Sequence, residues 1–235
     1  MGRTQFGPTE SRLGTRATLK AQNIRWIWAV AMADALALVA MAFPAALNQA
    51  ASWITSGSRL AGISIAPIVV LLLTSLLPAD LKAALVFWRW RDALPGHRAF
   101  SVYGPADPRI DLQHLRTVTG PFPEVPREQN TLWYQLFRKV DSDPRVAEAH
   151  RHFLLFRDLA ALSVLLAVTA PLLLYLLGAT HIAIGLSAGI LAIQYLATVV
   201  GARNQGARLV CNVLALHSAD TAPRKTARRP RAKNP

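Results

Sequence analysis

The chain has 235 residues, of which 52% are apolar and only 17% charged, and its mean hydropathy is +0.27. Soluble domains are usually nearer a quarter charged, so charged residues are excluded from long blocks of this chain. The formal net charge of +13 can indicate nucleic-acid binding, but the distribution of that charge favours a membrane surface. The single cysteine, Cys211, excludes an internal disulfide and favours a reducing compartment.

Four stretches are long and apolar enough to be membrane-spanning helices. A bilayer core about 30 Å thick requires about 20 apolar residues in a helix. The expected spans are residues 24–43, 60–77, 159–177 and 182–201. Only four residues separate the third span from the fourth, so these two are expected to be antiparallel neighbours.

Basic residues are distributed very unevenly around these spans. The connection between the first two spans contains only Arg59, and the connection between the last two contains no basic residue. The other 25 of the 26 Lys and Arg residues would therefore lie on one side of the membrane. Because cytoplasmic segments carry the excess of Lys and Arg, we expect both termini and residues 78–158 to be cytoplasmic.

Residues 1–23 are expected to be a cytoplasmic N-terminal segment, and residues 78–158 a small helical cytoplasmic module. Capping and proline signals divide the module into helices. These are expected to begin at Asp80 (ending near Leu94), at Asp107-Pro108, at Pro126, and at Asp143-Pro144, the last continuing without a break into the third span. The proline-rich run 120–126 is expected to be neither helix nor central strand.

Asp34 is the most informative polar residue, because it lies about ten residues, or about 15 Å, into the first span. A carboxyl group at that depth costs about 2.5–3.5 kcal/mol to insert and usually faces a partner or water. Depth-matching pairs it with Thr169 in the third span and Gln194 in the fourth. One interpretation is a proton relay or pore lining. The favoured one is a protonated Asp34 hydrogen-bonded to Gln194, which holds the helices together.

Gly185 and Gly189 form a small-xxx-small face on the fourth span. Such faces allow close approach of two helices. Packing within the bundle is the favoured interpretation, and contact with a second copy of the chain is the alternative.

The cytoplasmic module contains a dense mixture of polar and aromatic side chains. If it binds a small anion or nucleotide, Arg109 and Arg127 would supply bidentate contacts, and Trp133 or Tyr134 a stacking face. The plainer interpretation is a hydrogen-bonded junction among short helices.

No catalytic or cofactor motif is visible, so neither an enzyme nor a cofactor is predicted. GxSxG, HExxH, CxxC, Walker and GxGxxG patterns are absent. His150 and His152, two residues apart on a helix, point in nearly opposite directions and cannot share a metal ion. A metal site assembled from His97, His114 and His152 is an unfavoured alternative, so no metal is predicted.

Two segments follow the fourth span. Residues 202–219 have an amphipathic pattern that favours a helix emerging from, or lying on, the inner leaflet. Residues 220–235 contain six basic residues and no acid after Asp220, and are expected to be a disordered basic tail. The expected partners are the lipid bilayer and, through this tail, anionic lipid headgroups. Nucleic acid is a less favoured partner for the tail.

The sequence therefore predicts an all-α, four-span membrane protein of the bacterial inner membrane. Three functions remain open. The favoured one is a non-enzymatic protein whose module senses a partner or small ligand and couples that event to the bundle, as an oligomeric pore or effector. A transporter or enzyme centred on Asp34 or on the cytoplasmic His and acidic residues is the second. A structural subunit of a membrane complex, as a homo-oligomer or beside another protein, is the third.

Overall fold

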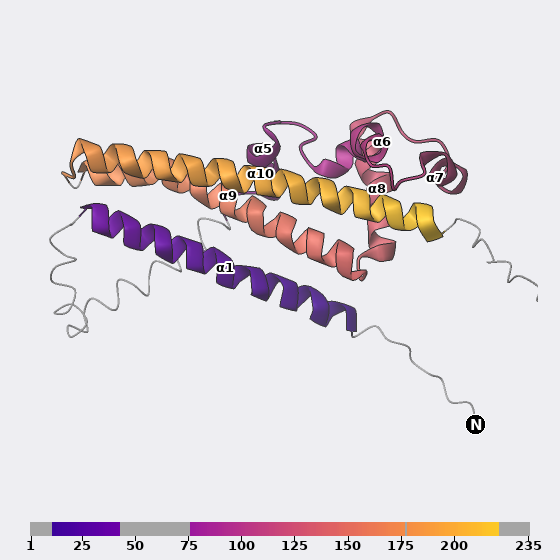
Figure 1. Cartoon of the computed structure of the whole chain (residues 1–235), viewed down its shortest axis with the longest axis horizontal. Coiled ribbons are helices and arrows are strands. Elements are labelled where there is room, and N and C mark those ends of the chain that lie inside the picture. Colours follow the sequence, from indigo (N-terminus) through magenta and orange to yellow (C-terminus); the bar gives the residue numbers. More distant parts are fainter. Residues whose placement is uncertain (1–10, 43–75, 177, 221–235) are drawn as a thin grey trace, which may run out of the picture. The chain divides into compact units, whose positions relative to one another are not determined.

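The computed structural model describes residues 11–42, 76–176 and 178–220 (Figure 1). Every regular element in these ranges is helical and none is a strand, which confirms the all-α prediction. The elements are α1 (Ser11–Ala42), α5 (Ala79–Phe87), η1 (Pro95–Arg98), η2 (Ala99–Tyr103), α6 (Gly104–Ala106), α7 (Leu112–Thr119), α8 (Pro126–Val140), α9 (Pro144–Leu176) and α10 (His181–Asp220).

Two of the described helices, α9 and α10, are long and apolar enough to cross a membrane. Only 39% of the most apolar window of α9 and 22% of that of α10 is buried within the structure, which is unlike the core helix of a soluble protein. Helix α1 includes residues 24–42 of the first expected span, but it begins earlier, at Ser11. The expected span 60–77 lies outside the described residues apart from its last two positions, and the tail 221–235 lies outside them entirely.

The chain divides into two compact units. The first comprises residues 1–94 and 147–209, and the second comprises residues 95–146 and 210–235. Helices α9 and α10 each contribute residues to both units, because each continues through a unit boundary without interruption.

In the first unit, the pairing of contacts defines the directions of the three long helices. Helices α9 and α10 lie side by side and antiparallel, as expected (Figure 1). A Cβ added to Gly201 would lie 2.9 Å from the ring of Phe156, and one added to Gly206 would lie 3.3 Å from the ring of Phe153. Helix α1 runs parallel to α9, since Ala31 and Leu162 are buried together and Asn23 contacts Arg151.

In the second unit, short helices pack around two aromatic clusters. The rings of Phe100 and Phe122 stack with centroids 4.5 Å apart, and those of Trp133 and Phe137 with centroids 5.5 Å apart. Gly96 permits this packing, because a Cβ there would overlap the side chain of Asn130 and lie 2.7 Å from Trp133. The run 121–125 is neither helix nor strand, as expected from its prolines.

The first module helix is shorter than expected. Helix α5 ends at Phe87 rather than near Leu94, because Trp88 adopts a left-handed conformation with φ 53°. Its N-cap is Pro78, and Asp80 lies in the first turn without a capping bond. The left-handed Trp88 is held by contacts with α10, which local sequence signals do not report.

The second module helix begins later than expected. Helix α7 starts at Leu112, and the cap is Asp111, whose side chain accepts a 2.9 Å hydrogen bond from the backbone N–H of His114. Asp107 instead accepts a 3.0 Å bond from the backbone N–H of Arg109, which forms a turn. Helices α8 and α9 begin at Pro126 and Pro144, as predicted.

The amphipathic segment 202–219 is the continuation of α10 and not a separate helix. Val210, Val213 and Leu214 are fully buried in the structure. The side-chain amide of Asn212 donates a 3.3 Å bond to the backbone oxygen of Arg145. The apolar face of residues 210–218 therefore packs within the second unit.

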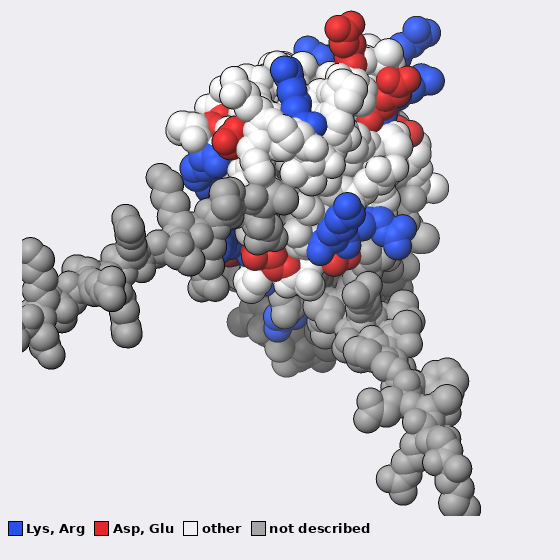
Figure 2. Space-filling model, turned by 90° about the vertical axis from the view of Figure 1, so that its right-hand side faces the viewer, with Lys and Arg blue, Asp and Glu red and all other residues white. Residues whose placement is uncertain are grey.

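Charged side chains of the two signs are interspersed on the face shown in Figure 2, with acidic groups beside most of the basic ones. No broad basic patch is visible on that face. A basic surface of that kind would be the electrostatic signature of a nucleic-acid interface.

Candidate functional site

A polar network connects the three long helices within the apolar part of the first unit. The side-chain amide of Gln194 on α10 donates a 3.0 Å bond to the Asp34 carboxyl group on α1. The same nitrogen donates a 3.1 Å bond to the hydroxyl of Ser163 on α9, which is fully buried. Ser163 in turn donates a 2.9 Å bond to the backbone oxygen of Leu159. Both N–H bonds of the Gln194 amide are thus used, one toward each neighbouring helix.

The network also indicates the depth of Asp34. Ser163 lies four residues after Leu159, where the third span was expected to begin. Because Ala31 of α1 packs against Leu162 of α9, Asp34 lies about six residues, or about 9 Å, beyond that level, rather than the ~15 Å that counting along the first span predicts. The parallel packing of α1 on α9, with Ala31 against Leu162, places residues 24–27 before the level of Leu159 along the helix axis. A polar group this near the border is easier to accommodate than one at the bilayer centre.

Thr169 is not part of this network. Its hydroxyl donates a 2.8 Å bond to the backbone oxygen of Leu165 within α9, and its side chain is exposed. It lies six residues after Ser163, or about 9 Å further along the helix. Depth counted from the start of the first span matches Asp34 to Thr169, whereas the packing of α1 on α9 brings it near Ser163 instead.

A second cluster fixes the C-terminal end of α5 against α10. The hydroxyl of Tyr195 donates a 2.8 Å bond to the backbone oxygen of Leu85, and Nε of Arg203 donates a 2.7 Å bond to that of Val86. The Arg203 guanidinium also lies over the Trp88 ring, 4.0 Å from its centroid. A cation at the last carbonyls of a helix is favoured by the helix dipole, and its stacking on Trp88 adds a cation–π contact.

An ion cluster lies at the expected cytoplasmic border of α9. Lys82 donates a 3.2 Å bond and Arg157 a 3.1 Å bond to the same oxygen of Asp158. The side chains of Lys82 and Arg157 are only 10% and 14% exposed. Two cations sharing one carboxylate join α5 to α9, and removal of the carboxylate would leave both cations uncompensated in a poorly hydrated position.

The glycine face of α10 has no partner among the described residues. A Cβ added to Gly185 or to Gly189 would meet no atom within 4 Å, and both positions are exposed. Close helix packing occurs instead at Gly201 and Gly206, further along the same helix. The face is therefore not used by α1 or α9.

The four ligand-binding candidates of the module do not form one open site. Arg109 is engaged by Asp107, whose carboxylate accepts bonds of 3.0 Å and 2.6 Å from the guanidinium. Trp133 is a core residue, 7% exposed, and its buried Nε1 has no hydrogen-bond partner in the described part of the chain. Arg127 and Tyr134 are exposed on α8. The geometry favours the helix-junction interpretation for Trp133.

Three groups of the second unit influence one another electrostatically. The hydrogen bond from Arg109 holds the pKa of the Asp107 carboxyl at about 2, well below its usual value. Burial, followed by the charge of Asp107, raises the pKa of the Cys211 thiol to about 11. Cys211 also lies 3.7 Å from the backbone oxygen of Tyr103, to which its thiol can donate. Cys211 is therefore a neutral thiol at physiological pH and unsuited to nucleophilic chemistry.

Gln129 is a buried polar hub of the module. Its side-chain oxygen accepts bonds from the backbone N–H of Phe100, at 3.3 Å, and from the hydroxyl of Ser101, at 3.2 Å. Its nitrogen donates a 3.4 Å bond to the backbone oxygen of Glu124. The one available signal was its i, i+4, i+8 spacing with Trp133 and Phe137, which places a polar residue on the apolar face.

In the described ranges, no group of three or more His, Cys, Asp and Glu side chains is placed to hold a metal ion. Comparisons with protein-family models, curated proteins and solved structures found no match. Fold and site together thus define an all-α chain with two helices able to cross a membrane, a polar network joining three helices, and a small helical unit built partly on the end of α10.

Proposed function

We propose that the chain is a non-enzymatic, multi-pass protein of the bacterial inner membrane that couples its cytoplasmic module to its membrane bundle. In this proposal both termini are cytoplasmic, and the spans 24–43 and 60–77 complete a four-span bundle with α9 and α10. The module, residues 78–158 with the end of α10, senses a partner or small ligand. The bundle responds as an effector or as one subunit of an oligomeric pore.

The observation that carries the proposal is the continuity of α10. Residues 182–201 of this helix supply the expected fourth span, and residues 210–218 supply part of the core of the second unit. His217 contacts the backbone oxygen of Leu136 at 2.9 Å, so the end of the helix is fixed by specific bonds as well as by apolar packing. A change in the module therefore has a continuous helical route to Gln194 and its network.

A hydrogen-exchange experiment on the full chain in lipid nanodiscs tests this coupling. Leu214→Ala removes a fully buried side chain from the module and is expected to raise exchange there and also at residues 190–198. Coupling is reciprocal, so Gln194→Ala is expected to raise exchange at residues 95–146. Leu196→Ala, at a side chain that is 50% exposed, is the matched control and is expected to change neither region. Effects confined to the mutated unit would overturn the proposal.

The proposed topology has a separate test, which uses the single cysteine of the chain. Two variants are made in a Cys211→Ser background, His181→Cys and Ser142→Cys. Both substituted positions are exposed. A membrane-impermeant maleimide added to spheroplasts is expected to label the first directly and the second only after permeabilisation. Labelling of both, or of neither, before permeabilisation would contradict the topology.

A further inference from the structure

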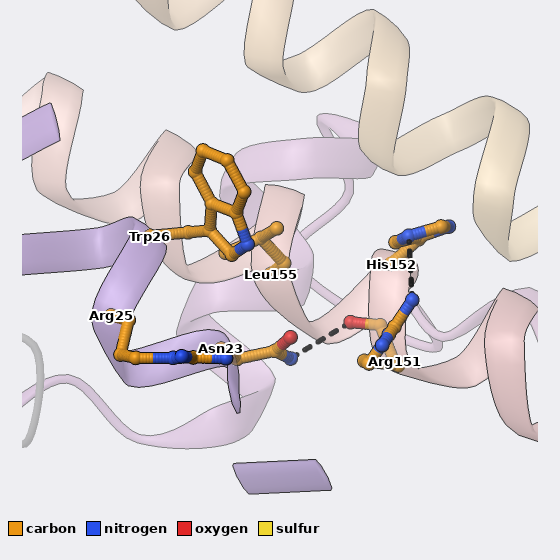
Figure 3. A pocket seen from close by; sticks show the side chains of 6 residues that line it. All are labelled: Asn23, Arg25, Trp26, Arg151, His152 and Leu155. Carbon is orange, nitrogen blue, oxygen red and sulfur yellow. Dashed lines mark hydrogen bonds between the residues drawn. The ribbon is translucent and has the colours of Figure 1, made fainter. Parts of the chain in front are cut away.

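A small cavity lies between α1 and α9, at the start of the first expected span and just before the start of the third. It measures about 100 Å³ and is lined by Asn23, Arg25, Trp26, Arg151, His152 and Leu155. Figure 3 shows the three α1 residues opposite the three α9 residues, with one hydrogen bond between the helices, from Asn23 to Arg151, and one within α9, between Arg151 and His152. Neither the polar network nor the coupling helix uses these side chains.

The described residues of the cavity wall are rich in hydrogen-bond donors, and none of them is acidic. A guanidinium group can only donate, so the 3.3 Å contact between Arg151 and Nε2 of His152 makes Nε2 the acceptor and places the ring proton of the neutral histidine on Nδ1. The Asn23 amide donates one N–H to the backbone oxygen of Arg151 at 2.9 Å and has a second N–H by its chemistry. Convergent hydrogen-bond donors and two guanidinium groups are the properties of an anion site.

The apolar part of the wall and its depth narrow the class of anion. Trp26, 64% exposed, and Leu155 stand beside the two arginines. Leu155 lies four residues before Leu159, or about 6 Å on the cytoplasmic side of the expected hydrocarbon border, where the headgroup region of a leaflet lies. Exposed tryptophan beside arginine is typical of that depth.

We infer that this cavity binds a phosphate group, and specifically the headgroup phosphate of an anionic phospholipid of the inner leaflet. Arg25 and Arg151 would pair with the phosphate oxygens, and Trp26 and Leu155 would contact the glycerol and the first acyl carbons. The choice of a lipid source rests on the proposed membrane placement of α1 and α9. The inference that the cavity binds a phosphate group does not depend on that placement.

Native mass spectrometry of the full chain in detergent tests the inference with three probes: phosphatidylglycerol, phosphatidylcholine and inorganic phosphate. Phosphatidylglycerol is expected to bind the unaltered chain more tightly than phosphatidylcholine, whose choline offsets the phosphate charge. Arg25→Gln, at an exposed residue, and the double variant with Arg151→Gln are expected to weaken phosphatidylglycerol binding, the double variant by about tenfold or more. The basic tail is unchanged in every variant.

The matched control is Arg127→Gln with Arg138→Gln, which removes the same charge from exposed positions on α8. Equal weakening in the control and cavity variants would overturn the inference, because net charge alone would explain it. Arg25→Lys separates charge from geometry, since lysine keeps the charge but loses the bidentate fork; intermediate binding is expected, and full binding would count against the site. Tight binding of inorganic phosphate that the cavity variants abolish would support the phosphate chemistry and overturn the lipid source. The coupling experiment reads hydrogen exchange, so its failure is distinguishable from failure of lipid binding.

Discussion

Gln194 and Asp34, 160 positions apart in the sequence, are joined by a 3.0 Å hydrogen bond from the amide to the carboxyl group. The amide also holds Ser163, so one side chain of α10 satisfies a polar group on each of two other helices. Polar contacts between helices in a membrane contribute about 0.6 kcal/mol on average and up to about 1.7 kcal/mol. A free energy of this size is enough to favour one packing arrangement of the helices, but it is a small part of their total stability.

Substitution of Gln194 is expected to be more costly than loss of either partner. Gln194→Ala removes both bonds and leaves Asp34 without this donor, so we expect a loss of about 1–3 kcal/mol in the free energy of unfolding. Asp34→Asn keeps an acceptor for the amide and is expected to cost less. Reversible unfolding in mixed detergent measures both.

The matched control for this prediction is Thr169→Ala, because Thr169 bonds only to its own helix and is exposed. We expect it to change stability by less than about 0.5 kcal/mol. A Thr169→Ala loss equal to that of Gln194→Ala would show that the network has no special role in helix packing.

The end of α5 is expected to depend on the shape of Arg203 and not only on its charge. Arg203→Lys keeps the cation but cannot donate to Val86 and stack on Trp88 with the same planar group. We expect faster hydrogen exchange at the last amides of α5. Arg208→Lys, at an exposed position on the same helix, is the control and is expected to leave α5 unchanged. Equal exchange in the two variants would show that α5 does not need the guanidinium.

Helix boundaries set by local chemistry could be predicted from the sequence, and those set by distant contacts could not. Pro126 and Pro144 each begin a helix, because proline at the first helical position has the required φ and no N–H to lose. The end of α5 at Phe87 depends instead on the contact of Trp88 with Arg203, 115 positions later in the numbering. Asp107 and Asp111 both had capping chemistry, and only the fold selects between them.

The candidate site divides in the same way. Gln194 was expected opposite Asp34, and the structure places them in contact. Ser163 was passed over because Asp34 was matched to the third span by counting from residue 24, whereas the packing of α1 on α9 sets which residues lie side by side. Trp133 was considered as a ligand face, but it is buried in the core against Gly96, a contact that no pattern in α8 reveals.

Two kinds of glycine on α10 are expected to respond oppositely to alanine. A Cβ at Gly201 would lie 2.9 Å from the Phe156 ring, so Gly201→Ala is expected to overpack the α9–α10 contact and lower the free energy of unfolding by about 1–3 kcal/mol. Gly185→Ala meets no atom within 4 Å and is expected to be neutral or stabilising in the single chain. Reversible unfolding in detergent compares the two.

The oligomeric role proposed for the glycine face has a separate readout. If Gly185 and Gly189 contact a second copy of the chain, Gly185→Leu is expected to reduce the oligomeric mass measured by light scattering while leaving the free energy of unfolding of the monomer unchanged. If the oligomeric mass does not change, the glycine face of α10 is not part of the interface between copies.

The thiol of Cys211 reports on the charge of Asp107 inside the second unit. Burial raises the pKa of this thiol to about 11, and the Asp107 carboxylate is the second cause. Since the thiolate is the reactive form, alkylation by iodoacetamide is expected to be slow at neutral pH and to rise steeply only in alkaline solution. Asp107→Asn removes the negative charge and releases Arg109, whose positive charge favours the thiolate. Both effects lower the thiol pKa, so the rise is expected to begin at lower pH.

Asp143→Asn controls for a general effect of losing a carboxylate from the same unit, because Asp143 accepts a 2.8 Å bond from the backbone of Arg145 and is not among the groups that shift the Cys211 thiol. It is expected to leave the alkylation profile in place. The measurement needs no other substitution, because Cys211 is the single cysteine of the chain. If Asp107→Asn and Asp143→Asn shift the pH profile of alkylation equally, the second unit must open before Cys211 reacts. In that case the rate would report unfolding of the α10 end rather than the electrostatics around the thiol.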